Sequence, residues 1–170
     1  MSLAELNLRP SEIRALYLIH LHQTYSAECQ ALDALPHLAL NVSSLGLRQR
    51  LLLSATDTPE HVKMLETVFT ELAEVPGDSV CEPMKALIQF GADLLEQYPY
   101  GPARDLLLVG VAQEMKHLGI AKYAMSETFA SVLGCDHQQM RFSKAKSDEE
   151  MTDRELGFSI LSLRLTEDRL

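Results

Sequence analysis

The feature that most restricts how this chain can fold is the spacing of its apolar residues. In long stretches they recur every three or four positions, as between Ile13 and Leu35, and this period places them on one face of an α-helix. No stretch of useful length alternates apolar and polar residues as a half-buried β-strand does. The sequence therefore predicts an all-α protein.

Turn-forming residues divide this pattern into four long helices and a shorter one. The first long helix is expected from Pro10 to about Leu40, and the second from Leu45 to Ala73. Pro59 lies within the second helix, where a proline removes one backbone hydrogen bond. We expect this proline to bend the helix rather than to divide it.

Three further helices follow along the chain. A short helix that contains Met84 to Leu95 ends before two closely spaced prolines, and a long helix spans Arg104 to Leu133 and ends at Gly134. The last helix is expected to begin between His137 and Ser147 and to run to about Leu165.

The length of the chain fits one ordinary domain, because 170 residues can bury a core without disulfides or a structural metal. Short connections make helices that are neighbours in the sequence antiparallel. We therefore expect a single domain over residues 1–170 that is an antiparallel four-helix bundle. The additional short helix lies on the connection between the second and third long helices.

Charge and hydropathy argue against several classes of function. The net charge of -9 at pH 7 disfavours nucleic acid and anionic membrane surfaces as partners, because both attract clustered Lys and Arg. The longest apolar runs are far shorter than the roughly 20 residues that a membrane-spanning helix needs. The three cysteines form no CxxC pair, and the N-terminus lacks the pattern of a signal peptide. We expect reduced thiols and a cytoplasmic protein.

Three groups of residues follow one another in a characteristic order along nearly the whole chain. They are Thr24–Glu28 with Ala34–Pro36; His61–Phe69 with Cys81–Ile88; and Ala112, Gln113, His117, Ile120, Ala121, Tyr123, Leu133 and Gly134, followed by Thr152 and Asp153. Together they resemble the YciE/YciF family of ferritin-like proteins. The resemblance implies a ferritin-like bundle, a homodimer, an association with stress responses and a di-iron or di-manganese centre.

A dimetal centre of this type needs several carboxylates, because two hard cations lie close together. Ferritin-like bundles supply one Glu from each of two helices and a Glu-x-x-His or Glu-x-x-Glu pair from each of the others. By the resemblance, the single donors here are Glu28 and Glu149, or its neighbour Asp148. Both paired motifs are missing, and their positions are occupied by Thr56, Pro59, Lys116 and Gly119 in place of acids or histidine.

Lys116 is the most informative of these replacements. Its neighbours on the helix are mostly apolar, so we expect it to face inward, where an unpaired ammonium group would be costly. Our hypothesis is that Lys116 pairs with Glu28, Glu149 or both, in the space that two metal ions once occupied. The alternative is that its side chain extends along the bundle to water.

Weaker metal candidates are Asp57, His61 and Asp153. Asp57 and His61 are four residues apart, a spacing that can hold one ion, but Pro59 lies between them. We therefore favour a surface or capping role for this pair. Asp153 belongs to an acidic run that a solvated helix start explains.

These observations favour a non-enzymatic, stress-associated helical protein that acts through self-association or a protein partner and needs no cofactor. The alternative is a residual iron- or manganese-binding protein with ferroxidase-like or peroxide-related chemistry. A third possibility is a small-molecule or lipid pocket in the space that the lost metal centre leaves near Glu28 and Gly119.

Overall fold

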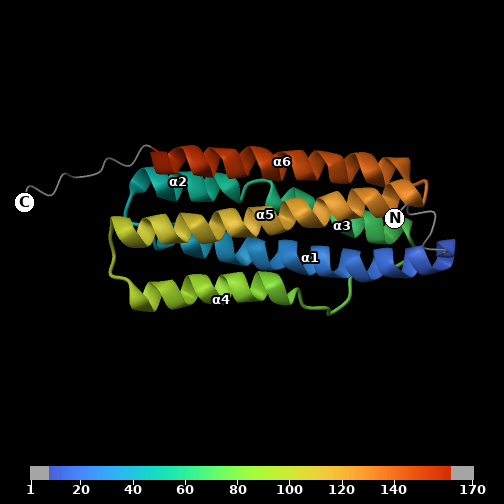
Figure 1. The fold of residues 1–170 in the computed structure, drawn as a ribbon, viewed down its shortest axis with the longest axis horizontal. Helices are drawn as coiled ribbons and strands as arrows, with labels where there is room; N and C mark the ends of the chain where they lie inside the picture. Colours follow the sequence, from blue (N-terminus) through green and yellow to red (C-terminus); the bar gives the residue numbers. More distant parts are fainter. Residues whose placement is uncertain (1–7, 162–170) are drawn as a thin grey trace, which may run out of the picture.

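The computed structural model describes residues 8–161, which form six α-helices and no β-strand (Figure 1). The helices are α1 (Pro10–Leu40), α2 (Leu45–Ser54), α3 (Thr58–Glu71), α4 (Glu82–Gln97), α5 (Pro102–Val132) and α6 (Asp136–Leu161). The prediction of an all-α chain is confirmed.

Four rods run side by side along the long axis of the molecule (Figure 1). Three of them are α1, α5 and α6, and the fourth consists of α2 and α3 placed one after the other. The shorter helix α4 packs outside this group, against α1 and α5. The arrangement confirms the predicted four-helix bundle with a short helix between the second and third rods.

The second rod is divided rather than bent, so that detail of the prediction was wrong. Helix α2 ends at Ser54, and the backbone N–H of Ala55 donates to the carbonyls of Leu52 and Leu53. Pro59 then lies in the first turn of α3. A proline suits this position because the first N–H groups of a helix have no partner within the helix. Pro59 thus starts a new helix instead of bending a continuous one.

The turn between α5 and α6 is short. Gly134 adopts a positive φ of 70°, as expected of a glycine that follows a helix. Helix α6 begins at Asp136, slightly earlier than predicted. The predicted end near Leu165 lies outside the described residues.

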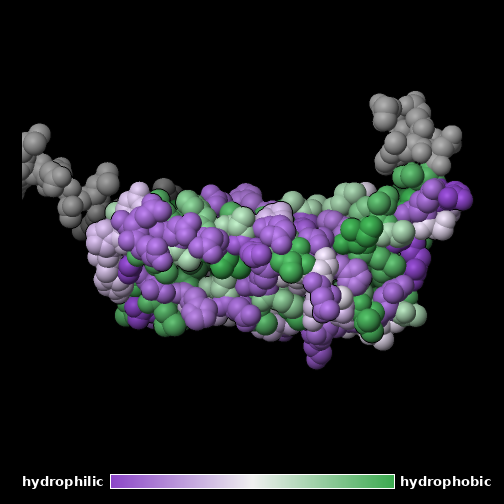
Figure 2. All heavy atoms as spheres, turned by 90° about the horizontal axis from the view of Figure 1, so that it is seen from below, coloured by the Kyte–Doolittle hydropathy of each residue, from purple (hydrophilic) through white to green (hydrophobic). Residues whose placement is uncertain are grey.

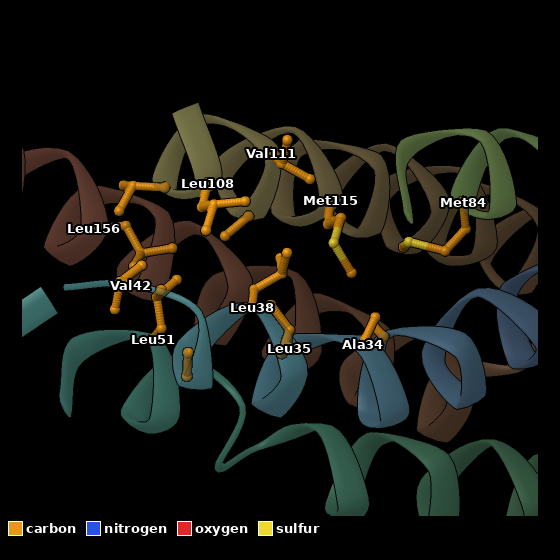
Figure 3. Close-up of a cluster of buried hydrophobic side chains, with 14 of the residues drawn as sticks. Ala34, Leu35, Leu38, Val42, Leu51, Met84, Leu108, Val111, Met115 and Leu156 are labelled. Atoms are coloured by element: carbon orange, nitrogen blue, oxygen red, sulfur yellow. The ribbon is translucent and has the colours of Figure 1, made fainter. Parts of the chain in front are cut away.

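Two clusters of buried hydrophobic side chains hold the rods together. The larger contains Leu35, Leu51 and Leu108 and lies toward the α2 and α4 end of the bundle (Figure 3). The other contains Tyr17 and Phe142, along with residues of α3 and the second half of α5. Along α5 and α6, buried polar residues separate the two clusters.

The face shown in Figure 2 is mostly mixed in character. On the face that includes α1 and α4, hydrophobic groups gather toward the end of the molecule where α1 begins (Figure 2). Two apolar residues of α1, Leu16 and Ile19, are 45% and 63% exposed. Within residues 8–161, no helix combines the length and the apolar character needed to cross a membrane.

Candidate functional site

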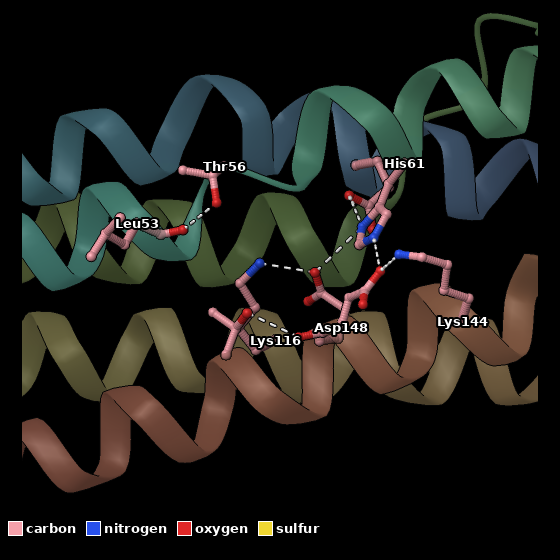
Figure 4. Close-up of polar contacts among 9 residues, drawn as sticks. Leu53, Thr56, His61, Lys116, Lys144 and Asp148 are labelled. Atoms are coloured by element: carbon pink, nitrogen blue, oxygen red, sulfur yellow. Dashed lines mark hydrogen bonds and ion pairs between the residues drawn. The ribbon is translucent and has the colours of Figure 1, made fainter.

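Four buried charged or titratable residues meet between the two hydrophobic clusters, one from each rod. Glu28 comes from α1, His61 from α3, Lys116 from α5 and Glu149 from α6. Each is at most 5% exposed. Figure 4 shows Lys116 and His61 in this region, with Asp148 and Lys144 beside them. Since buried charges are costly unless they are paired, this group is a candidate for function or for a specific structural role.

The shortest contact in the group is between Lys116 and Glu149. The Nζ atom of Lys116 donates a hydrogen bond to Oε1 of Glu149 at 2.9 Å. Both side chains are 4% exposed, so the ammonium group of Lys116 does not reach water. The inward orientation predicted from the apolar neighbours of Lys116 agrees with this burial.

His61 lies at the centre of three carboxylates. Its Nδ1 atom is 3.5 Å from Oε1 of Glu149 and 3.8 Å from Oε2 of Glu28. Its Nε2 atom is 3.6 Å from Oδ2 of Asp148, which also forms an ion pair with Lys144 at the surface. Neither ring nitrogen of His61 has a hydrogen-bond partner among the described residues.

The ionisation of the group reflects burial and mutual charge. Burial lowers the pKa of His61, but the nearby carboxylates of Glu28 and Glu149 outweigh it, so the pKa is raised above its usual value. Burial raises the pKa of Glu149 to about 7, although the charge of Lys116 opposes this shift. The pKa of Tyr123, whose ring packs against His61, is raised by burial and by the two glutamates.

Gly119 makes room for the carboxylate of Glu149. A Cβ atom at position 119 would lie 2.9 Å from Oε2 of Glu149, closer than real Cβ contacts allow. The space beside Gly119 on α5 is therefore filled by the carboxylate from α6. A small enclosed cavity of about 10 Å³ remains beside Glu28, Lys116, Gly119 and Glu149, enough for about one water molecule.

The other candidates named from the sequence lie apart from this group. Asp57 is half-buried and precedes the first residue of α3, without a side-chain capping bond. Asp153 accepts a hydrogen bond from Gln113 and pairs with His117 at 3.3 Å. The surface or capping role expected of His61 was wrong, because its ring is buried.

The break between α2 and α3 explains why the sequence predicted a surface or capping role for His61 and not a buried one. Thr56 lies in the break between α2 and α3, where its hydroxyl donates to the carbonyl of Leu53, and Pro59 is exposed. A break between two helices resets which residues face inward. The sequence signal for this break was Asp57-Thr58-Pro59, which is typical of a helix start, with His61 four residues after Asp57.

The residues present do not fit a dinuclear metal centre. Around the cluster, the described residues offer only three carboxylates and one imidazole, from Glu28, Asp148, Glu149 and His61. The ammonium group of Lys116 already contacts one of those carboxylates. A second cation would therefore meet positive charge and too few oxygen donors.

A shallow pocket of about 130 Å³ opens next to this group on the face between α3 and α6. It is lined by Glu60, His61, Met64, Arg141, Lys144, Ala145 and Asp148. His61 therefore lies between this surface pocket and the buried glutamates, and Asp148 and Lys144 stand at the same place. His61 and Asp148 are thus the residues of this region that line the pocket.

The fold and the position of the polar group together define a ferritin-like helical bundle. Ferritin-like proteins place their metal ligands in this way, on inward faces of the long helices. The chain belongs to the family described as the domain of unknown function DUF892, whose model matches residues 12–160.

Relatives with similar sequence and structure support this assignment. Protein YciF of Escherichia coli (strain K12) is 27% identical over 145 residues, which cover 85% of this chain and 87% of YciF. The crystal structure of E. coli YciF, which is described as a stress protein, matches with a TM-score of 0.83. The match covers 88% of this chain and 94% of the YciF chain. YcfI of Rhodopseudomonas palustris, which is 24% identical, has the same fold, with a TM-score of 0.82 over 90% of this chain and 95% of its own.

Proposed function

We propose that this protein acts through its fold and its contacts with other proteins, and that an internal ion-pair cluster has taken the place of a dinuclear metal centre. The observation that carries the proposal is the buried contact between Lys116 Nζ and Glu149 Oε1 at 2.9 Å. In a dimetal protein of this fold, α5 would contribute two ligands at this level. Here α5 contributes an ammonium group and a glycine.

Charge balance supports a bundle that is stable without two metal ions. The carboxylates near the centre belong to Glu28, Asp148 and Glu149, and the lysines paired with them are Lys116 and Lys144. The two ammonium groups offset negative charge on these three carboxyl groups. The raised pKa of Glu149, about 7, reduces that negative charge, and the raised pKa of His61 favours a proton that offsets what remains. No redox-active cation is needed for neutrality.

The proposed biological setting follows the described relative. YciF of E. coli is described as a stress protein, and we extend a stress association to this chain. We also propose a cytoplasmic homodimer. The exposed apolar residues Leu16 and Ile19 on α1 are candidates for a contact with a second copy or with a protein partner.

The test is whether the protein oxidises ferrous iron. Untagged protein produced in medium supplemented with iron and manganese is analysed for bound metal, and its aerobic consumption of Fe(II) is compared with that of a ferritin. We expect fewer than two metals per chain and an oxidation rate equal to that of buffer alone.

A competing function would give a different result. Two tightly bound metals per chain, together with oxygen- or peroxide-dependent iron oxidation, would restore the ferroxidase-like assignment and refute the proposed one. The variant Lys116→Glu serves as a comparison, because it replaces the ammonium group with a carboxylate at the position where α5 lacks a ligand.

A further inference from the structure

Three buried donor atoms face one another at the centre of the bundle without touching. Oε1 of Glu149 and Oε2 of Glu28 lie 3.5 Å and 3.8 Å from Nδ1 of His61. These separations are longer than a normal hydrogen bond. All three residues are buried, and one donor atom from each lies within 4.8 Å of the others.

From this geometry we propose that Glu28, His61 and Glu149 bind one divalent first-row transition-metal ion, with Zn²⁺ as the best match. Metal–nitrogen and metal–oxygen bonds to Zn²⁺ are about 2.0–2.2 Å, so neighbouring ligands of a tetrahedral ion are about 3.4 Å apart. The spacing of the donors around His61 is close to this value. One nitrogen and two oxygen ligands leave a fourth position for water.

The unsatisfied imidazole is the observation that points to a ligand. His61 is 4% exposed, and neither of its ring nitrogens has a hydrogen-bond partner among residues 8–161. The three carboxylates around the ring lie 3.5–3.8 Å from its nitrogens, too far for good hydrogen bonds, and a buried polar group without a hydrogen bond costs free energy. An ion bound between the three side chains would use the Nδ1 lone pair and both glutamate oxygens together.

Asp148 lies where a carboxylate that does not bind the ion itself can orient the histidine that does. Its Oδ2 atom is 3.6 Å from Nε2 of His61, on the opposite side of the ring from the two glutamates. In many metal sites, the ligating histidine donates its other N–H to a carboxylate, which fixes the tautomer. This placement of Asp148 favours a proton on Nε2, so a bound ion would displace the proton of Nδ1 and take its place between Nδ1, Glu28 and Glu149.

Lys116 limits the site to one ion. Its ammonium group contacts the same Oε1 atom of Glu149 that faces His61, so it occupies the side of Glu149 where a second ion would bind. The positive charge also weakens the pull of Glu149 on the first ion. We therefore expect a single ion, bound more weakly than in a site with free carboxylates.

An ion can reach these donors from the surface. The pocket of about 130 Å³ between α3 and α6 includes His61 and Asp148 in its lining. The ion pair between Lys144 and Asp148 lies at this pocket, and Lys144 is 74% exposed. We expect an ion to enter from this pocket, past the side chains of Lys144 and His61.

The inference goes beyond the proposed function, and the number of ions bound separates the two. One ion per chain supports this site and also agrees with the proposed absence of a dinuclear centre. Background metal overturns this site but not the proposed function. Two ions per chain overturn both.

The experiment is equilibrium dialysis of untagged wild-type protein against zinc chloride, followed by elemental analysis. The test variant is His61→Gln, and the matched control is His117→Gln, which removes a histidine that is 67% exposed on α5. We expect one Zn²⁺ per chain in the wild type and the control, and at least a tenfold loss of affinity in the test variant. Equal binding in all three proteins would overturn the proposal.

A second measurement does not depend on how the variant folds. X-ray absorption spectroscopy of the zinc-loaded wild-type protein reports the ligands directly. We expect nitrogen and oxygen ligands only, with a single imidazole. Sulfur ligands, which would come from Cys29, Cys81 or Cys135, or more than one imidazole, would place the ion elsewhere and refute the proposed site.

Discussion

Oε1 of Glu149 accepts a hydrogen bond from Nζ of Lys116 in the interior of the bundle, where both side chains are 4% exposed. The contact joins α5 to α6, the two helices with the most extensive contact in the molecule. It links the stability of the fold to the charge at its centre, because the ammonium group that stabilises Glu149 also places positive charge among the buried carboxylates.

Removing the ammonium group should destabilise the protein strongly. We expect Lys116→Met to lower the free energy of unfolding by about 3–5 kcal/mol, because it leaves a buried carboxylate without its partner. Urea denaturation followed by circular dichroism measures the change. The double variant Lys116→Met with Glu149→Gln removes both charges, and we expect it to lose less than the sum of the single variants. Strict additivity would show that the two groups do not interact.

The pH dependence of stability should carry the signature of Glu149. The pKa of this carboxyl is raised from 4.5 to about 7 in the folded protein, by burial against the opposing charge of Lys116. The folded state therefore holds a proton that the unfolded state releases near pH 4.5. This contribution to stability is complete below pH 4.5 and is lost as the pH rises through about 7.

His61 should change stability in the same direction. Burial lowers the pKa of His61, but Glu28 and Glu149 raise it by more. The pKa of His61 in the folded protein therefore lies above the unfolded value of 6.5. Its contribution is present below pH 6.5 and is lost at higher pH.

The variant Glu149→Gln tests the prediction for Glu149. We expect the difference in melting temperature between this variant and the wild type to depend on pH between 4.5 and 7. A difference that stays constant over this range would contradict the raised pKa of Glu149.

Gly119 and Gly110 form a matched pair on the same helix. A methyl group at Gly119 would meet the carboxylate of Glu149 at 2.9 Å, whereas nothing lies within 4 Å of a Cβ atom at Gly110. We expect Gly119→Ala to cost about 1–3 kcal/mol through overpacking. Gly110→Ala should stabilise by roughly 0.5–1 kcal/mol, because alanine favours helix. Thermal unfolding of both variants tests this, and equal effects would argue against the close approach of Glu149.

The sequence was most informative where a helix runs without interruption. Helix α5 spans Pro102–Val132, so the positions of its apolar residues fix which face is buried and give the inward orientation of Lys116. Glu28 on α1 was placed in the same way. In both helices the phase is constant over many turns, and an error in one boundary does not move a residue from one face to another.

The sequence was least informative where the second rod is divided. His61 lies in the first turns of α3, and its phase depends on the turn at Ala55–Asp57 rather than on α2. Periodicity alone does not give the angle between two successive helices. Asp148 was predicted only as an alternative to Glu149, because it belongs to the same run of acidic residues. Only the packing of α3 against α6 shows that Asp148 faces His61.

The role of Asp148 can be tested separately from that of the three ligands. We expect Asp148→Asn to weaken zinc binding by about 10–100-fold, because an amide holds the histidine tautomer less strongly than a carboxylate does. Isothermal titration calorimetry with zinc chloride measures the affinity. The control Asp57→Asn removes the same charge from a half-buried residue that lies outside the proposed ligand set, so it reports the general effect of lost negative charge. If the two variants bind zinc equally well, Asp148 acts only through its charge and the proposed orientation of His61 is wrong.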